Sequence, residues 1–108
     1  MFKPNLMLVC VLVSILTLFS GPAMAHTPLC SCYDNGDGTI TCEGGFSDGS
    51  SASGVRMHIV KSDGGVLVEG KMDADSEYTF NKPAGDYTVV FDAGEGHVIK
   101  IDGSEIVE

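Results

Sequence analysis

Short runs that alternate between apolar and polar side chains are the feature that most constrains the fold of this chain. Val55, Met57 and Ile59 are apolar, and the residues between them are polar. This period of two residues turns one face of an extended strand toward a core and the other toward solvent. Turns such as Ser62-Asp63-Gly64-Gly65 recur about every ten residues, and no stretch has a helical period. We therefore predict an all-β domain.

We predict that the strands form a small antiparallel β-sandwich of six or seven strands with one buried face. The chain has no tryptophan, so tyrosine and phenylalanine must fill most of the core. The aromatic residues expected to do so are Phe46, Tyr78, Phe80, Tyr87 and Phe91. The expected strands cover residues 39–46, 55–61, 66–71, 77–80, 86–92 and 97–102.

Residues 1–25 have the features of a secretory signal peptide. A short positive start is followed by an apolar run over residues 6–19, and then by Ala23-Met24-Ala25. The run is shorter than the roughly 20 apolar residues of a membrane-spanning helix. We predict a signal helix that is cleaved after Ala25, which leaves no stable membrane span. The mature protein would be periplasmic or secreted and would begin at His26.

The mature chain divides into two parts in sequence. Residues 26–38 hold two cysteines and a turn rich in Gly and Asp, with little to bury, so we expect an N-terminal arm. Residues 39–108 are expected to form the β-sandwich domain. Loss of Lys3 with the signal peptide changes the formal net charge from −9 to −10. Such an acidic chain is a poor partner for nucleic acid or for an anionic membrane surface.

Three cysteines remain after Cys10 leaves with the signal peptide, namely Cys30, Cys32 and Cys42. An odd number in an oxidising compartment indicates one disulfide and one free thiol, or a metal site. Cys30 and Cys32 lie on the same side of an extended segment, and either can reach Cys42 across a hairpin. We favour Cys32–Cys42, the tighter closure. If both thiols stayed reduced, Cys30 and Cys32 could instead bind Cu⁺ or Zn²⁺.

Several motifs resemble known families of extracytoplasmic sandwich. Residues 62–71 (SDGGVLVEGK), 78–80 (YTF) and 83–87 (PAGDY) together resemble a carboxypeptidase-regulatory-like domain. This resemblance implies a transthyretin-like or immunoglobulin-like sandwich. Residues 91–97 (FDAGEGH) and 46–49 (FSDG) are similar to the small periplasmic accessory component (NikL/CbiL type) of nickel and cobalt energy-coupling-factor transporters. That similarity implies a mature chain beginning with histidine and a metal-transporter membrane component as partner.

Histidines provide the main candidate metal ligands. Cleavage after Ala25 would give His26 a free α-amine beside its imidazole, and the two nitrogens can close one chelate ring on a metal ion. Ni²⁺ or Co²⁺ would suit this donor set, and Cu²⁺ is not excluded. His97, at the end of a glycine-rich turn, either joins this site or forms a capping hydrogen bond within its loop. Cys30 is a further candidate ligand, whereas His58 is a weaker one because Arg56 lies beside it.

Signatures of catalysis are missing from the sequence, which contains no nucleophile elbow and no H-E-x-x-H motif. The lack of a C-x-x-C-H motif excludes covalently attached haem, and the lack of a P-loop argues against nucleotide. We expect a non-enzymatic metal-binding accessory protein. The alternatives are a structural or protein-interaction sandwich of the cell envelope, which would bind through an exposed sheet edge, and a thiol redox protein using Cys30 or Cys32.

Overall fold

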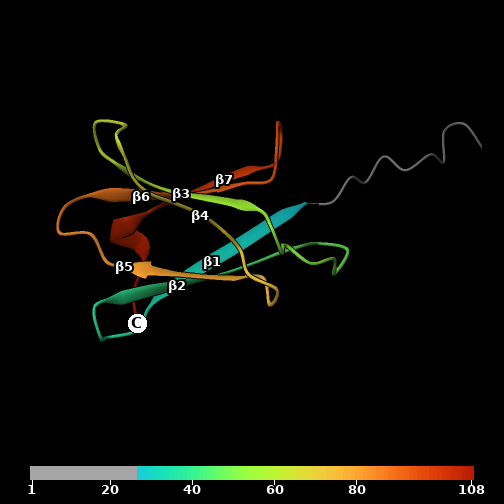
Figure 1. Cartoon of the computed structure of the whole chain (residues 1–108), viewed down its shortest axis with the longest axis horizontal. Coiled ribbons are helices and arrows are strands. Elements are labelled where there is room, and N and C mark those ends of the chain that lie inside the picture. The colour runs from blue at the N-terminus through green and yellow to red at the C-terminus, as the bar shows by residue number, and fades with distance from the viewer. Residues whose placement is uncertain (1–26) are drawn as a thin grey trace, which may run out of the picture.

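The computed structural model describes residues 27–108, which fold into two antiparallel β-sheets packed face to face (Figure 1). One sheet has the order β1-β2-β5 and the other the order β4-β3-β6-β7. This confirms the all-β sandwich expected from the alternating pattern. The strands are β1 (Pro28–Asp34), β2 (Thr39–Phe46), β3 (Arg56–Lys61), β4 (Val66–Lys71), β5 (Glu77–Asn81), β6 (Tyr87–Asp92) and β7 (Val98–Asp102), followed by a short 3-10 helix, η1 (Gly103–Glu105).

Connections between strands are of two kinds, hairpins within a sheet and crossings from one sheet to the other. β1–β2, β3–β4 and β6–β7 are hairpins within a sheet, whereas the segments after β2, β4 and β5 each cross to the opposite sheet. The fourth strand therefore lies beside the third, in the sheet that also holds β6 and β7. This order is that of an immunoglobulin-like sandwich whose fourth strand has joined the second sheet.

The segment expected to form an arm is instead a full strand of the sandwich. β1 pairs with β2 along its whole length, from Pro28 opposite Phe46 to Asp34 opposite Ile40. Two residues of its less exposed face, Cys30 and Cys32, pack against the core. Cysteine buries well but is small, so β1 shows no run of large apolar residues that would indicate a strand in the sequence. The sandwich therefore includes residues 28–34.

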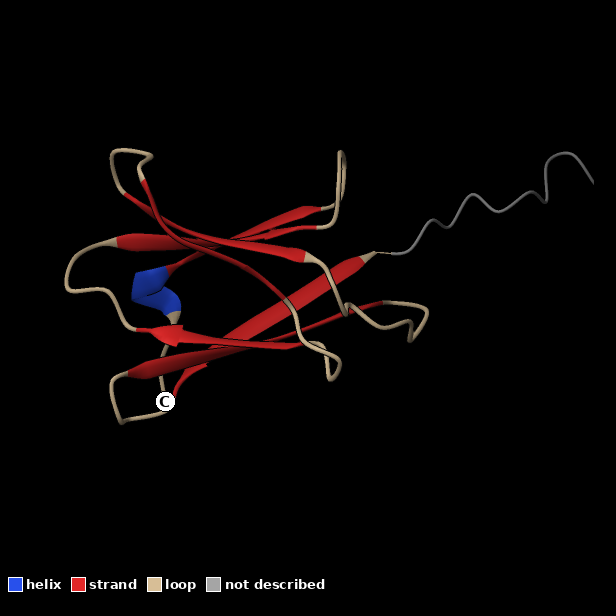
Figure 2. Ribbon diagram, in the orientation of Figure 1, coloured by secondary structure: helices blue, strands red, loops and turns tan. Residues whose placement is uncertain are grey.

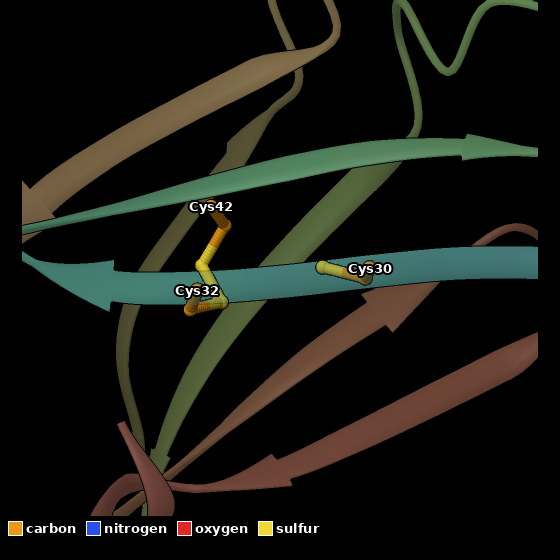
Figure 3. A group of neighbouring side chains, drawn as sticks. All are labelled: Cys30, Cys32 and Cys42. Atoms are coloured by element: carbon orange, nitrogen blue, oxygen red, sulfur yellow. A yellow bond between two sulfur atoms is a disulfide. The ribbon is translucent and has the colours of Figure 1, made fainter. Parts of the chain in front are cut away.

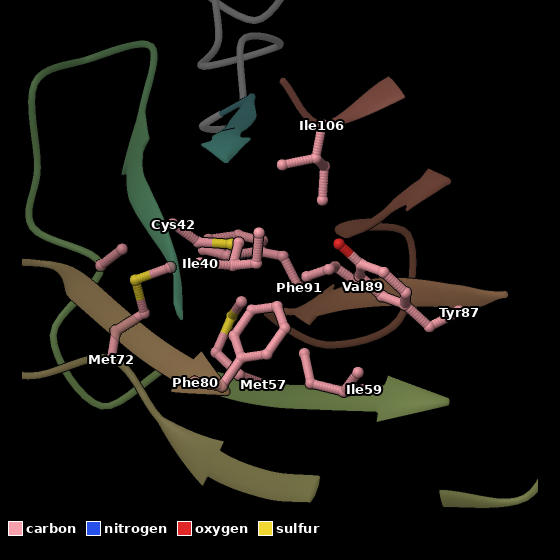
Figure 4. Packing of buried hydrophobic residues seen from close by; sticks show 11 residues of the cluster. Ile40, Cys42, Met57, Ile59, Met72, Phe80, Tyr87, Val89, Phe91 and Ile106 are labelled. Carbon is pink, nitrogen blue, oxygen red and sulfur yellow. The ribbon is translucent and has the colours of Figure 1, made fainter. Parts of the chain in front are cut away.

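Side chains from both sheets interdigitate in one core (Figure 4). Phe91 on β6 is fully buried, and its ring centroid lies 6.2 Å from that of Phe46. Tyr78 and Phe46 are only partly buried and pack at the margin of the core. The alternation is confirmed along all of β6 and over the Met57–Ile59 part of β3, where buried residues alternate with partly exposed ones. The buried hydrophobic residues are Ile40, Cys42, Ala52, Met57, Ile59, Met72, Phe80, Tyr87, Val89, Phe91 and Ile106.

Four segments meet at one end of the sandwich, which we name the Thr27 end. They are the start of the described chain at Thr27, the β2–β3 loop, the β4–β5 turn and the β6–β7 hairpin, residues 93–97. In Figure 1 the start of β1 and the β6–β7 hairpin both lie on the right of the view. Figure 2 shows η1, in blue, between the two sheets at the opposite end.

Candidate metal centre

The β6–β7 hairpin holds His97 through a compact set of backbone hydrogen bonds. The amide of Ala93 donates to the carbonyl of His97 over 3.0 Å, and the amide of His97 donates to the carbonyl of Gly94 over 2.8 Å. Gly94 and Gly96 have φ angles of 110° and 78°, which residues with a side chain rarely adopt. The glycines thus permit a tight turn that fixes the backbone of His97 at the Thr27 end.

The imidazole of His97 is partly exposed and contacts its own loop. Its Nδ1 lies 3.1 Å from the carbonyl oxygen of Glu95. Because a carbonyl only accepts, this hydrogen bond requires a proton on Nδ1, and it is Nε2 that carries the free lone pair in the neutral form of the ring. A backbone carbonyl bound to one ring nitrogen is a common way to orient a metal-binding histidine. The capping contact expected from the sequence is therefore present, and it uses a different nitrogen from the one a metal would need.

His26 lies outside the described residues, but the residue that follows it is well fixed. The amide of Thr27 donates to Ser47 Oγ over 3.0 Å, and the amide of Ser47 donates to the carbonyl of Thr27 over 2.9 Å. These bonds attach Thr27 to the β2–β3 loop. The chain therefore enters the sandwich at the same end as the hairpin that carries His97.

β1 and β7 are edge strands of opposite sheets and contact each other. Both strands run away from the Thr27 end. Thr27 immediately precedes β1, and His97 immediately precedes β7. Thr27 and His97 thus occupy equivalent positions. Each lies one residue before the start of its own strand, and the two strands contact each other.

His58 has different surroundings from His97. It is partly exposed on β3, opposite Glu69 of β4 and Val90 of β6. It lines a shallow hollow together with Arg56 and Lys71. The positive charges of these two side chains repel a metal cation. Among residues 27–108, no cluster of three side chains suited to hold a metal includes His58 or His97. A metal ion at His97 would therefore have fewer than three ligands from residues 27–108, unless residues outside that range supply more.

The disulfide expected between Cys32 and Cys42 is present (Figure 3). The two residues lie directly opposite each other in the β1–β2 ladder, with their Cα atoms 4.0 Å apart. The bridge joins neighbouring strands of one sheet and so fastens the edge strand β1 to β2. A disulfide in a small β domain is typical of proteins that work outside the cytoplasm.

Cys30 is a free, partly exposed thiol, two residues before Cys32 on the same face of β1. Its sulfur points along β1 toward the bridge in Figure 3. Burial raises the pKa of Cys30 to about 11, so the group is a neutral thiol at physiological pH. A reactive cysteine needs a lowered pKa, and this observation weighs against a thiol redox enzyme.

The three sulfur atoms of Cys30, Cys32 and Cys42 all lie within 4.8 Å of one another. Spacing in the sequence placed Cys30 and Cys32 on one side of a strand. It did not place Cys42 against both of them, because the register between β1 and β2 was open. The structure sets that register, with Cys32 opposite Cys42 and Cys30 opposite Gly44.

A second cluster of potential ligands was not anticipated from the sequence. Asp73, Asp75 and Glu77 bring their carboxylates within 4.8 Å of one another in the β4–β5 turn. The signal that could have found them is the alternation of acids, D-x-D-x-E. Asp73 Oδ1 accepts hydrogen bonds from the amides of Asp75, at 2.8 Å, and Glu77, at 3.0 Å. These hydrogen bonds show that Asp73 stabilises the β4–β5 turn, which is an ordinary structural role for an aspartate.

Comparisons with protein-family models, with curated proteins and with solved structures find no match for this chain. The class of protein is therefore defined by its own features, which over residues 27–108 are a seven-strand β-sandwich and one disulfide. Between residues 27 and 108, no helix is long and apolar enough to cross a membrane. The disulfide fits a location outside the cytoplasm.

Proposed function

We propose that this chain is an exported, non-enzymatic metal-binding accessory protein that takes part in nickel or cobalt uptake. In this proposal the signal peptide is cleaved after Ala25, and the mature protein works in the periplasm or outside the cell. Its partner is the membrane component of a metal transporter. One observation carries the proposal: the residue after His26 and the hairpin that holds His97 lie at the same end of the sandwich, at the starts of contacting strands.

The proposed site combines ligands from both strands. His26 supplies its α-amine and imidazole, which shed protons near neutral pH, with unperturbed pKa values of about 7.7 and 6.5. His97 supplies Nε2, the nitrogen not used in its contact with Glu95. Cys30, near the start of β1, is a further candidate ligand. Nitrogen donors suit borderline cations such as Ni²⁺, Co²⁺ and Cu²⁺, and the acidic surface raises their local concentration modestly.

Isothermal titration of the mature protein, residues 26–108, with each cation tests the proposal. We expect one ion per chain for at least one of Ni²⁺, Co²⁺ and Cu²⁺. The paired substitution His26→Ala and His97→Ala should abolish that binding, whereas His58→Ala should leave it unchanged. Equal binding by the wild type and the paired variant would exclude the site.

A second form of the protein tests whether the α-amine of His26 binds the metal together with the imidazole, or whether the imidazole binds alone. Retaining Ala25 before His26 keeps every side chain but moves the free amine one residue away. We expect binding to weaken by about tenfold or more, which is the loss of about 1.4 kcal/mol from one metal–nitrogen bond. Unchanged affinity would show that the amine is not a ligand and that cleavage after Ala25 has no role in metal binding.

One observation also favours a protein-interaction module as a second candidate. Edge strand β4 exposes Val66 and Leu67, which are 52% and 43% accessible. Leu67 lines an open groove of about 570 Å³ between the β3–β4 hairpin and the β5–β6 loop. A photoreactive residue at position 67 should then cross-link to one envelope protein, and the same residue at exposed Lys100 of β7 should not. Equal labelling from both positions would contradict this candidate.

A further inference from the structure

We propose that Cys30, Cys32 and Cys42 form a redox-gated site that binds one Cu⁺ ion when the Cys32–Cys42 bond is reduced. This site shares one candidate ligand, Cys30, with the histidine site proposed above but does not depend on that site. In the disulfide form only Cys30 has a free sulfur, and no site exists. Reduction supplies two more sulfur ligands at the same place.

The geometry of the three sulfurs fits a single soft cation. A cation with metal–sulfur bonds of about 2.3 Å, at the centre of an equilateral triangle, holds its ligands about 4 Å apart. The three sulfurs already lie within 4.8 Å of one another. They come from two strands whose backbones are held in register by the β1–β2 ladder. Side-chain rotation alone can therefore bring them around one ion.

The surroundings favour Cu⁺ over Zn²⁺. Structural zinc sites almost always have four ligands, whereas three thiolates can complete a trigonal Cu⁺ site. Within residues 27–108, no histidine or carboxylate joins the three sulfurs in the cluster. Glu43, the acid next to Cys42, is exposed and lines the surface hollow beside Cys30, but its carboxylate does not belong to the sulfur cluster. Cys42 is fully buried, and the other two cysteines pack against the apolar core, as suits a soft cation.

An approach to the site from solvent is also present. Cys30 and Gly44, which lie opposite each other in the ladder, both line an open hollow of about 370 Å³ on the surface. Gly44 has no side chain to cover the thiol. A β-carbon at Gly44 would lie 3.1 Å from the sulfur of Met72, which places a fourth soft sulfur near this part of the core. A cation can thus reach Cys30 without opening the sandwich.

The chemistry balances with a small dithiol as the reductant. The dithiol gives two electrons and two protons, its own two sulfurs form a disulfide, and the Cys32–Cys42 bond becomes two thiols. Binding of one Cu⁺ then displaces the three thiol protons to solvent and forms three copper–sulfur bonds. Re-oxidation of Cys32 and Cys42 by a disulfide oxidant takes two electrons from their sulfurs, restores their bond and releases the ion.

Competition between the mature protein and a chromophoric Cu⁺ chelator, under anaerobic conditions, tests this site. The protein is reduced with a phosphine, desalted and titrated with Cu⁺. We expect the reduced form to hold one ion per chain and the oxidised form to bind at least about tenfold more weakly. Cys30→Ser should weaken binding by the reduced form by about tenfold or more, because one of three sulfur ligands is lost. Copper X-ray absorption should show three sulfur neighbours.

Two outcomes would overturn the proposal. One is equal Cu⁺ affinity of the reduced and oxidised forms, and the other is equal affinity of the reduced wild type and Cys30→Ser. If reduction unfolds the domain, Cu⁺ should restore the β-sheet circular dichroism spectrum of the wild type but not that of Cys30→Ser. Failure to restore it would equally contradict the site.

The histidine variants keep the two proposals apart. Substitution of both His26 and His97 by Ala should leave Cu⁺ binding by the reduced protein intact, because no histidine belongs to the sulfur cluster. Loss of Cu⁺ binding in that variant would show that the copper ligands are the histidines. Conversely, absence of Ni²⁺ and Co²⁺ binding would contradict the proposed function and leave the copper test unaffected.

Discussion

Lys82 Nζ lies 2.8 Å from Asp34 Oδ2 and forms an ion pair between the last residue of β1 and the residue that follows β5. β1 and β5 flank β2 on opposite sides, so this pair bridges the whole three-stranded sheet. Asp34 Oδ1 also accepts a hydrogen bond from the amide of Gly36 over 2.8 Å. The carboxylate therefore helps to fasten both the edge strand and the turn that follows it.

The first prediction concerns stability in acid. The hydrogen bond from Lys82, followed by that from Gly36, lowers the pKa of Asp34 below its usual value of 3.8. The folded state then binds fewer protons than the unfolded state, and the stabilisation present above about pH 4 disappears as the pH falls through the folded pKa. We expect the free energy of unfolding to fall less steeply with acid in Lys82→Met than in the wild type.

Urea denaturation between pH 2 and pH 6 measures this dependence, with Lys100→Met as the matched control because no ion pair to Lys100 is observed among residues 27–108. Lowered pKa values of Asp37 and Asp102, caused by hydrogen bonds from Thr39 and Ser104, add to the same acid dependence in every variant. Identical curves for the Lys82 and Lys100 variants would refute a role for the Asp34–Lys82 pair.

The second prediction concerns the disulfide. The bridge closes a loop with a sequence separation of 10 residues. Loop closure of this size stabilises a protein by about 2–3 kcal/mol. The paired substitution Cys32→Ala and Cys42→Ala should lower the free energy of unfolding by about this amount and remove its sensitivity to reductant. Cys30→Ala retains the bridge and should stay sensitive. A paired variant as stable as the oxidised wild type would contradict this expectation.

The third prediction concerns Gly44 on β2. A β-carbon at this position would lie 2.7 Å from Cε2 of Phe91 and 3.1 Å from the sulfur of Met72. Overpacking of a core commonly costs about 1–3 kcal/mol, so Gly44→Ala should reduce stability by that amount. Gly45→Ala is a matched control one residue away, where the nearest atom would lie 3.9 Å from the new carbon. Thermal denaturation of both variants measures the difference, and equal melting temperatures would show that the core yields at this point.

The fourth prediction concerns the hairpin that holds His97. Gly94 has a φ of 110°, a conformation that alanine adopts only with strain of about 1–3 kcal/mol. Gly94→Ala should therefore lower the melting temperature and shift the amide resonance of His97, whose N–H donates to the carbonyl of Gly94. Gly85→Ala serves as the control, because Gly85 has open space around it and no left-handed backbone. An unshifted His97 resonance in Gly94→Ala would argue against this role.

Most of the strand positions could be predicted from the sequence because the signals are local. The alternation in β3 and β6 depends on the two-residue period of a strand, and the turns depend on residues such as Gly64 that tolerate a left-handed backbone. Both kinds of signal act within a few residues of the chain. β1 had the weakest signal because its inner face consists of cysteines, and it was identified only through its pairing with β2.

The candidate sites also divide into features that local sequence signals predict and features that depend on contacts between distant segments. The sequence offered His97 and the three cysteines as candidate ligands and favoured the disulfide that is present, because residue type and short spacing carry those signals. It did not show that Thr27 and His97 occupy equivalent positions on contacting strands, or that Cys30 lies beside both bridged sulfurs. Only strand register and sheet packing decide such distances.

Alternation, turn chemistry and cysteine spacing act over a few residues, so they were enough to predict the all-β sandwich and to favour Cys32–Cys42 over Cys30–Cys42 as the disulfide. The tertiary structure decided that β1 is a strand of the sandwich, that the three sulfurs form one cluster and that the His97 hairpin shares an end with Thr27. These relationships depend on contacts between residues far apart in the chain. Those contacts form together when the two sheets pack around Phe91 and the other core residues.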